Sequence, residues 1–216
     1  MEQWIYSQGK YLYQDFLLDS AGLIRHIRRN ATQEKGAIIA QRRVKNHPTP
    51  EPIGEHALVL LRIVTLCAEA DMIRHLMSVP ILPIGKKTLR PDFVLAPVDG
   101  ISGVPGRAVP CGWTGAEYVR HPDTGAPIAG RILTFWKEAL ETAMRAHTHY
   151  AGYFSLGWGV AITEQGPAIL EANTVWDGET MQKPHDLPLG ETAFRDLCLN
   201  RIAFCRSVDF RTLLSF

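Results

Sequence analysis

Short apolar runs separated by turn-forming residues recur along most of this 216-residue chain. Alternating apolar and polar side chains, or a short apolar run bounded by turn residues, are typical of β-strands. By these criteria the sequence predicts strands at residues 10–13, 37–44, 57–68, 71–79, 93–99, 158–163 and 168–172. The last two form a hairpin, because Gly166 can take a positive φ in the turn at 164–167 and Pro167 sets the entry of the second strand.

Apolar residues at helical spacing predict three helices, at residues 19–29, 135–150 and 191–206. On the second of these, His147 lies within the apolar stripe. We therefore expect His147 to be a core histidine with satisfied hydrogen bonds rather than a catalyst. Residues 84–91, 118–125 and the Pro- and Gly-rich stretch 177–189 are expected to be irregular.

The best internal boundary is the His-Pro-Thr-Pro-Glu-Pro stretch at residues 47–52. Its three prolines remove backbone donors and bias their neighbours toward extended shapes, which excludes regular structure. The sequence thus divides into residues 1–46 and 47–216, and the mixture of strands and helices predicts an α+β fold.

Composition excludes several classes of function. The apolar fraction of 46% and the charged fraction of 21% are ordinary for a globular protein, and a net charge of +1 indicates neither a nucleic-acid nor a membrane surface. The longest apolar run, residues 57–61, is far too short to span a bilayer, and no secretory signal is evident. Four widely spaced cysteines with no C-x-x-C pattern are typical of reduced thiols in a cytoplasmic protein.

Three polar residues are candidates for chemistry. Glu171 and Asn173 leave the strand at 168–172 on the same face, and their oxygens suit a hard cation such as magnesium; the alternative is a solvated strand end. Arg62 lies inside the apolar run Leu-Leu-Arg-Ile-Val-Thr at residues 60–65 and needs a partner, either a structural salt bridge or a phosphate.

The sequence of the predicted hairpin resembles that of a known family. Gly-Trp-Gly-Val-Ala-Ile-Thr at 157–163, followed by Gly-Pro-Ala-Ile-Leu-Glu-Ala-Asn at 166–173, resembles the end of an ATP-grasp domain, most closely the sugar-transfer-associated branch. Further segments are similar in the same order, so that the resemblance covers about residues 36–182: they are Ile-Ile-Ala-Gln-Arg-Arg-Val-Lys-Asn-His-Pro at 38–48, Arg-Ile-Val-Thr at 62–65, Ala-Pro-Val-Asp-Gly-Ile-Ser-Gly at 96–103 and Arg-His-Pro-Asp-Thr-Gly at 120–125.

The resemblance implies a fold and a site. The fold would be ATP-grasp-like, a mostly antiparallel sheet with packed helices that lacks a full N-terminal lobe. Residues 1–46 would be a remnant of the first ATP-grasp subdomain, ending in the adenine-hinge strand, and 47–216 the C-terminal subdomain. The implied residues are Gln41, Arg42 and Val44 at adenine, Arg62 as the catalytic and phosphate-binding residue, and Glu171 and Asn173 at magnesium.

The resemblance also implies a reaction. With ATP and magnesium as cofactors, such a protein is an ATP-dependent carboxylate–amine ligase that acts through an acyl phosphate on small carboxylate and amine substrates, in saccharide or peptide biosynthesis. Positioning and charge neutralisation would supply nearly all of the rate.

Departures from the family pattern leave a second hypothesis open. Gly159 stands where the family has an aspartate that binds metal, and Gln8-Gly9-Lys10 is the only candidate for a glycine-rich loop upstream of Ala37. The alternative is a non-catalytic or truncated module that binds nucleotide or scaffolds a partner, with a second copy or a partner protein covering the missing lobe. If the site is shared, Arg62, Glu171 and Asn173 should converge on one cleft.

Overall fold

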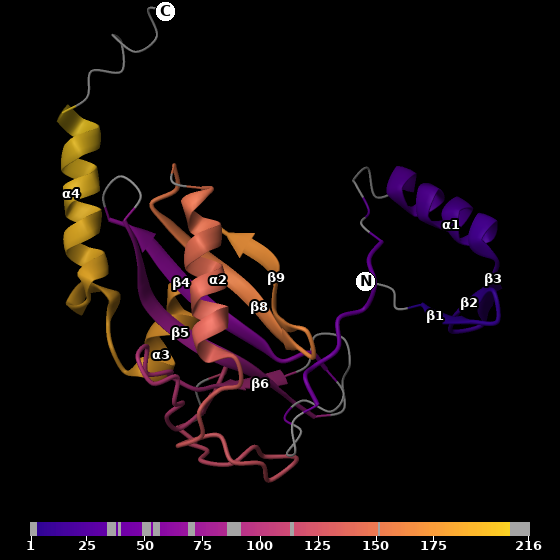
Figure 1. Ribbon diagram of the computed structural model, residues 1–216, viewed down its shortest axis with the longest axis horizontal. Helices are drawn as coiled ribbons and strands as arrows, with labels where there is room; N and C mark the ends of the chain where they lie inside the picture. Colours follow the sequence, from indigo (N-terminus) through magenta and orange to yellow (C-terminus); the bar gives the residue numbers. More distant parts are fainter. Residues whose placement is uncertain are drawn as a thin grey trace, which may run out of the picture. The chain divides into compact units, whose positions relative to one another are not determined.

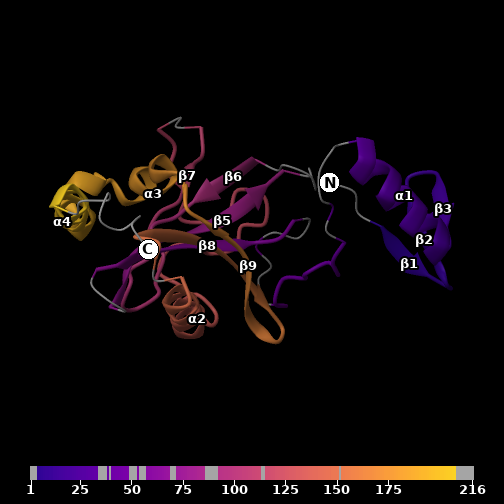
Figure 2. The same cartoon turned by 90° about the horizontal axis from the view of Figure 1, so that it is seen from above.

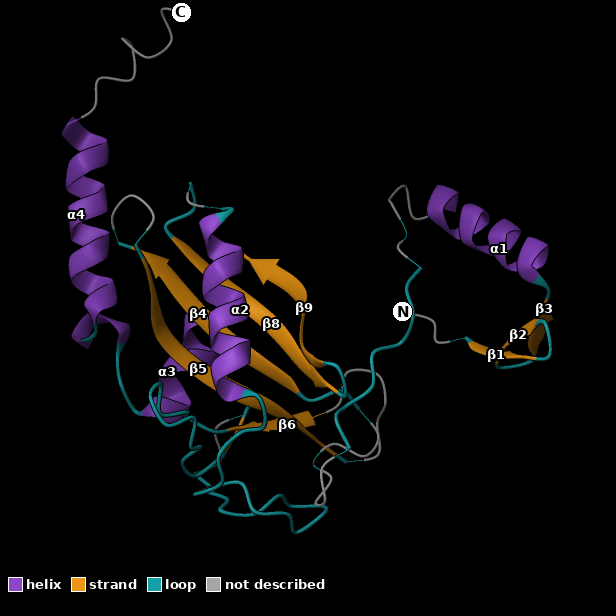
Figure 3. Ribbon diagram, in the orientation of Figure 1, coloured by secondary structure: helices purple, strands orange, loops and turns teal. Residues whose placement is uncertain are grey.

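The computed structural model divides the chain into two compact units, Met1–Arg43 and Val44–Phe216, and each is described by itself. The structure describes residues 4–33, 38, 40–48, 53, 57–68, 72–85, 92–112, 115–150 and 152–207. Figure 1 shows the elements coloured along the sequence, and Figure 3 shows the same view by secondary structure.

The first unit is a small three-stranded sheet followed by one helix. Strands β1 (Ile5–Ser7), β2 (Lys10–Tyr13) and β3 (Phe16–Leu18) pair antiparallel in that order. Helix α1 (Ser20–Gln33) begins after Asp19, whose Oδ1 accepts a hydrogen bond of 2.6 Å from the backbone N–H of Gly22 and so caps the helix. The predicted strand at 10–13 and the helix predicted at 19–29 are confirmed, and the helix extends further.

The predicted strand at 37–44 is wrong for the residues that the structure describes. Ile38 and residues 40–44 belong to no strand, and the remaining positions lie outside the described residues. Ile38 is 41% exposed and Gln41, Arg42 and Arg43 are exposed. Among the described positions these exposed side chains bury no common face, and strands are stabilised mainly by such packing.

The second unit contains a six-stranded sheet, in which every neighbouring pair is antiparallel and the order is β7-β6-β5-β4-β8-β9. Its strands are β4 (Leu60–Cys67), β5 (Ile73–Ile84), β6 (Asp92–Leu95), β7 (Val109–Pro110), β8 (Ser155–Thr163) and β9 (Gly166–Asn173). The predicted hairpin and the strands predicted at 57–68, 71–79 and 93–99 are confirmed, with shifted ends. The antiparallel sheet with packed helices confirms the predicted α+β, ATP-grasp-like fold class.

Strand β5 extends to Ile84, beyond the predicted end at residue 79, although it contains Pro80 and Pro83. The Ser78 carbonyl accepts a hydrogen bond from Val98 N–H on the side of β5 that faces β6. Because backbone groups alternate in direction along a strand, the backbone nitrogen of Pro80 faces the same side. There β6 pairs with β5 only from Ile81 onward. Pro83 lies beyond the Leu60–Ile81 pair at which β4 begins. The missing N–H of each proline therefore falls where no neighbouring strand requires it.

Helix α2 (Trp136–Thr148) covers one face of this sheet, which we call the α2 face (Figure 2). The core there joins Leu61, Ile63, Leu156, Trp158 and Val160 of the strands to Trp136, Ala139 and Ala143 of the helix. His147 is fully buried: its Nδ1 lies 2.7 Å from Thr65 Oγ1 and its Nε2 lies 3.0 Å from the Tyr153 carbonyl. Trp158 Nε1 donates to the same Thr65 oxygen at 2.8 Å, so His147 is a satisfied core histidine, as predicted.

Helix α3 (Gly178–His185) covers part of the opposite face, which we call the α3 face (Figure 2). Its buried Met181 packs with Trp176, Val64, Met77, Val79 and Leu95. The prediction that 177–189 is irregular is wrong, because the Asp177 side chain accepts from Thr180 N–H at the start of the helix and burial of Met181 outweighs the poor helix propensity of Gly178 and Pro184. Helix α4 (Ala193–Ser207) follows a 3₁₀ turn at Leu189–Glu191 and confirms the predicted C-terminal helix.

The loop at 118–125 fastens the end of β5. His121 is 2% exposed, and its Nε2 donates to the Pro83 carbonyl at 2.9 Å. Asp123 Oδ2 accepts from Gly85 N–H at 2.6 Å, and Gly125 takes a φ of 69° that favours glycine. The His-Pro-Asp-Thr-Gly motif thus has a structural role that sequence reasoning could not supply.

In the part of the chain that the structure describes, no helix combines the length and apolar character needed to cross a bilayer.

Candidate functional site

Three neighbouring strands place Arg62, Gly159 and Glu171 side by side on the α3 face. Arg62 of β4 is the Cα partner of Gly159 of β8, and Gly159 is the partner of Glu171 of β9. Cross-strand partners project to the same face of a sheet. Leu61 and Ile63, on either side of Arg62, belong to the core under α2, which turns Arg62 to the other face.

Arg62 and Glu171 form an ion pair across the glycine. Arg62 Nη2 lies 2.9 Å from Glu171 Oε1, with side-chain exposures of 17% and 47%. A Cβ built on Gly159 would stand 2.7 Å from Glu171 Cγ and 3.1 Å from its Oε1. Glu171 therefore lies over Gly159, in space that any larger residue at 159 would need. The bare glycine is what lets the two charged side chains meet across an intervening strand.

Arg62 keeps a further donor for a ligand. Its Nη1 is buried and has no hydrogen-bond partner among the residues that the structure describes. A guanidinium remains charged at any physiological pH, and a buried charged donor without a partner is costly. An oxyanion at Nη1 would remove this cost, and the geometry of the guanidinium suits phosphate or carboxylate oxygens.

Asn173 lies two residues beyond Glu171, at the end of β9, and is half-buried. Its strand partner is Gly157, and the space beside Gly157 is filled by Trp176. The structure thus brings Arg62 and Glu171 into contact and places Asn173 on the same face of the same strand. Among the described residues, no hydrogen bond joins the Asn173 side chain to either of them.

The donor set does not fit a magnesium ion as it stands. Mg²⁺ takes octahedral oxygen ligands and is held by one or two carboxylates that are free to bind it. Here the single carboxylate of Glu171 is already paired with a guanidinium. The described residues contain no group of three or more His, Cys, Asp or Glu side chains placed to hold a metal.

The residues predicted to seat adenine lie in two different units. Gln41 and Arg42 are exposed residues of the first unit, and Val44 is half-buried at the start of the second. After Val44 the chain is fastened to the sheet: His47 N–H donates to the Ile162 carbonyl at 2.8 Å, and the Asn46 side chain bonds the Ala57 carbonyl and the Val59 N–H, each at 2.9 Å. No motif in the sequence pointed to this attachment.

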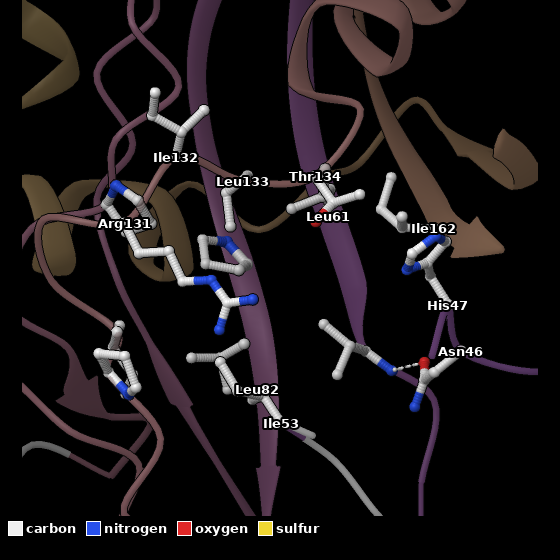
Figure 4. A pocket seen from close by; sticks show the side chains of 15 residues that line it. Asn46, His47, Ile53, Leu61, Leu82, Arg131, Ile132, Leu133, Thr134 and Ile162 are labelled. Carbon is white, nitrogen blue, oxygen red and sulfur yellow. Dashed lines mark hydrogen bonds between the residues drawn. The ribbon is translucent and has the colours of Figure 1, made fainter. Parts of the chain in front are cut away.

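A cavity of about 100 Å³ lies on the opposite, α2 face (Figure 4). Its floor includes Leu61, Leu82 and Ile162 of the strands, and its wall includes residues 131–134. His47 faces it, and the buried Nδ1 of that ring has no hydrogen-bond partner within the described ranges. Since Leu61 and Arg62 point to opposite faces, this cavity does not belong to the Arg62–Glu171 pair. Of the three residues predicted to share one cleft, Arg62 and Glu171 meet in an ion pair and Asn173 lies on the same face.

Burial lowers the pKa of two half-buried histidines of the second unit, His75 and His185. Burial lowers the pKa of His75 to about 4, against a hydrogen bond that favours protonation and with a small further lowering by His185. Its Nε2 lies 2.7 Å from Ser78 Oγ, and its ring stands edge-on to Trp136. Burial likewise lowers the pKa of His185. Both rings are therefore neutral at pH 7.

A protein-family model described as sugar-transfer associated ATP-grasp matches residues 21–192. This span covers more than half of the chain and includes Gln41, Arg42, Val44, Arg62, Glu171 and Asn173. No match was found among the curated proteins or among the solved structures.

Proposed function

The chain belongs to the sugar-transfer associated ATP-grasp family, and from that premise we propose that it binds ATP on the α3 face of its sheet, with Arg62 holding a phosphate group. Family membership supports an ATP-binding, ligase-like function. The observation that carries the residue assignment is the buried Nη1 of Arg62, which lacks a partner among the described residues while Nη2 is held by Glu171.

The ion pair prepares Arg62 for this role. Glu171 fixes the guanidinium plane, so less side-chain entropy is lost when an anion binds. The donor is also shielded from water, where a charge-assisted hydrogen bond is stronger than in an exposed position. Gln41, Arg42 and Val44 remain the residues that we propose for adenine, and the assignment of 1–46 and 47–216 to two ATP-grasp subdomains is part of the same proposal.

The second candidate function is turnover as a carboxylate–amine ligase, which the family match favours. Bound ATP would supply a phosphoryl group for activation of a carboxylate, and Arg62 would stabilise the charge on that group. The arrangement at Gly159 favours the nucleotide-binding module over the ligase, because Arg62 already holds one oxygen of the Glu171 carboxylate proposed for magnesium and residue 159 adds no ligand. A cytoplasmic location, and a second copy or partner protein acting with the module, stay predictions.

The test is a calorimetric titration of ATP into the protein and into Arg62→Met. Methionine keeps the length and packing of the side chain without its donors, so ATP affinity should fall about 10- to 100-fold while the variant stays folded. Arg107→Met is the matched control, since Arg107 is exposed and lies 3.6 Å from exposed Glu117. Equal affinities for the protein and Arg62→Met would reject the assignment, and no binding by the unmodified protein would reject the function.

A further inference from the structure

We infer that this site binds the nucleotide phosphates without a divalent cation, because an internal ion pair occupies the place where a metal would need free carboxylates. This inference rests on the proposed function and specifies its ligand: the free nucleotide polyphosphate rather than its magnesium complex.

Next to Gly159, the charged groups offer an anion a donor without a described partner and offer a cation only a shared carboxylate. Arg62 contributes one positive charge and Glu171 one negative charge, and their facing atoms lie 2.9 Å apart. Between them Gly159 contributes none, and Asn173, the next residue on that face of β9, is neutral. A magnesium ion here would share its one carboxylate with a guanidinium and would be repelled by it. A phosphate would meet a positive group that still has a donor to offer.

The geometry at Gly159 opposes metal binding in a second way. Glu171 offers a metal only the oxygen that Arg62 does not hold, because its Oε1 pairs with Arg62 Nη2, and Gly159 adds no ligand. Its present position depends on the absence of a side chain at 159, since a Cβ there would stand 2.7 Å from Glu171 Cγ. Glu171 thus acts here as a positioning residue that orients Arg62.

The two roles for Glu171 predict opposite results for one substitution. Gln at 171 keeps an oxygen in place and removes the negative charge. A metal ligand treated in this way loses affinity for magnesium-ATP. A positioning residue whose charge partly neutralises Arg62 leaves an arginine that attracts phosphate at least as well, so Glu171→Gln should bind ATP as tightly as the unmodified protein or more tightly.

The experiment compares ATP titrations by calorimetry in magnesium buffer and in EDTA. For the unmodified protein ATP should bind in EDTA at least as tightly as in magnesium buffer, because excess magnesium converts free ATP into its complex and lowers the concentration of the ligand that the site takes. Binding that requires magnesium would overturn the inference and leave the proposed function intact. No binding in either buffer would reject the proposed function, and this inference with it.

Gly159→Asp, with Gly159→Asn as its matched control, tests whether the lack of a second carboxylate is what makes binding independent of magnesium. Both side chains displace Glu171 from above residue 159, but only aspartate adds a second carboxylate. In Gly159→Asp, binding should become stronger in magnesium than in EDTA by about tenfold or more, whereas Gly159→Asn should show no such difference. Far-UV circular dichroism shows whether each variant is folded. A folded Gly159→Asp variant whose ATP binding does not depend on magnesium would contradict the inference. If that variant does not fold, Glu171→Gln is the deciding variant, and weaker ATP binding by Glu171→Gln would overturn the inference.

Discussion

The two faces of the same strands use their buried polar groups differently. On the α2 face, Thr65 and His147 are fully buried and bond each other, and the Trp158 indole donates to the same hydroxyl. On the α3 face, Arg62 holds one partner and keeps Nη1 without one among the described residues. On the α2 face, Trp136 Nε1 of the helix and His47 Nδ1 beside the cavity are also buried without a described partner. The Trp136 donor is neutral and costs less than a charged one.

Along β4, residues that stabilise the fold and the residue proposed to bind a ligand face opposite sides of the sheet. Arg62 and Thr65 lie in the same β4, three residues apart, and turn to opposite faces. The Thr65 network is closed, so no group is left for a ligand. Arg62 has one donor, Nη1, without a partner among the described residues, and an anionic ligand would complete it. The comparison predicts that substitutions on the α2 face change the free energy of unfolding, whereas those at Arg62 change affinity.

Thr65→Val should give the largest loss of stability. Valine has the shape of threonine but leaves the Trp158 N–H and His147 Nδ1 without their shared partner, at a cost of about 4 kcal/mol in the free energy of unfolding. Urea denaturation measures it. Thr148→Val is the control, because Thr148 is exposed and bonds only the Arg145 carbonyl. A loss of less than about 1 kcal/mol would show that the network does not stabilise the α2 face.

Two glycines of β8 separate packing from function on the α3 face. Gly157→Ala should destabilise the protein by about 2 to 3 kcal/mol, because its Cβ would overlap the buried Trp176. Gly159→Ala should cost less than about 1 kcal/mol, because the half-exposed Glu171 side chain can move aside. Thermal unfolding of both variants gives the comparison. Equal losses would mean that Glu171 is held as rigidly as the core.

The third prediction concerns the pH dependence of the free energy of unfolding. The His75 pKa is about 4 in the folded chain, below its ordinary value of 6.5, so the unfolded chain binds the proton more readily. Stability from the neutral ring is fully present above pH 6.5 and is lost as pH falls toward 4, about 2 kcal/mol of it between pH 7 and pH 5. His75→Gln should flatten this dependence, whereas substitution of exposed His149 should not. Identical pH profiles for His75→Gln and the unmodified protein would refute it.

Much of the fold follows from periodicity. The long amphipathic helix and the β8–β9 hairpin carry strong local patterns, and both formed where the sequence predicts them. The predicted strand at 37–44 and the predicted irregular stretch at 177–189 were wrong because burial outweighed the local pattern. The described Ile38 is 41% exposed, whereas Met181 is buried against the sheet. Such tertiary contacts are absent from a local reading of sequence.

The site was partly foreseeable. A charge inside an apolar run needs a partner, and Glu171 takes one guanidinium nitrogen of Arg62 as the salt-bridge interpretation predicted. The phosphate interpretation stays a prediction for the other nitrogen. That Gly159 permits this pair depends on the register of three strands, which the sequence does not contain. The cavity beside His47 is assembled from loops and prolines without any motif.

One measurement tests the central claim most directly: ATP binding to the unmodified protein in EDTA, followed by calorimetry, with Arg62→Met measured alongside. The account predicts that ATP binds without a divalent cation and that Arg62→Met weakens binding about 10- to 100-fold. It is contradicted if ATP binds only when magnesium is restored, or if Arg62→Met binds as the unmodified protein does.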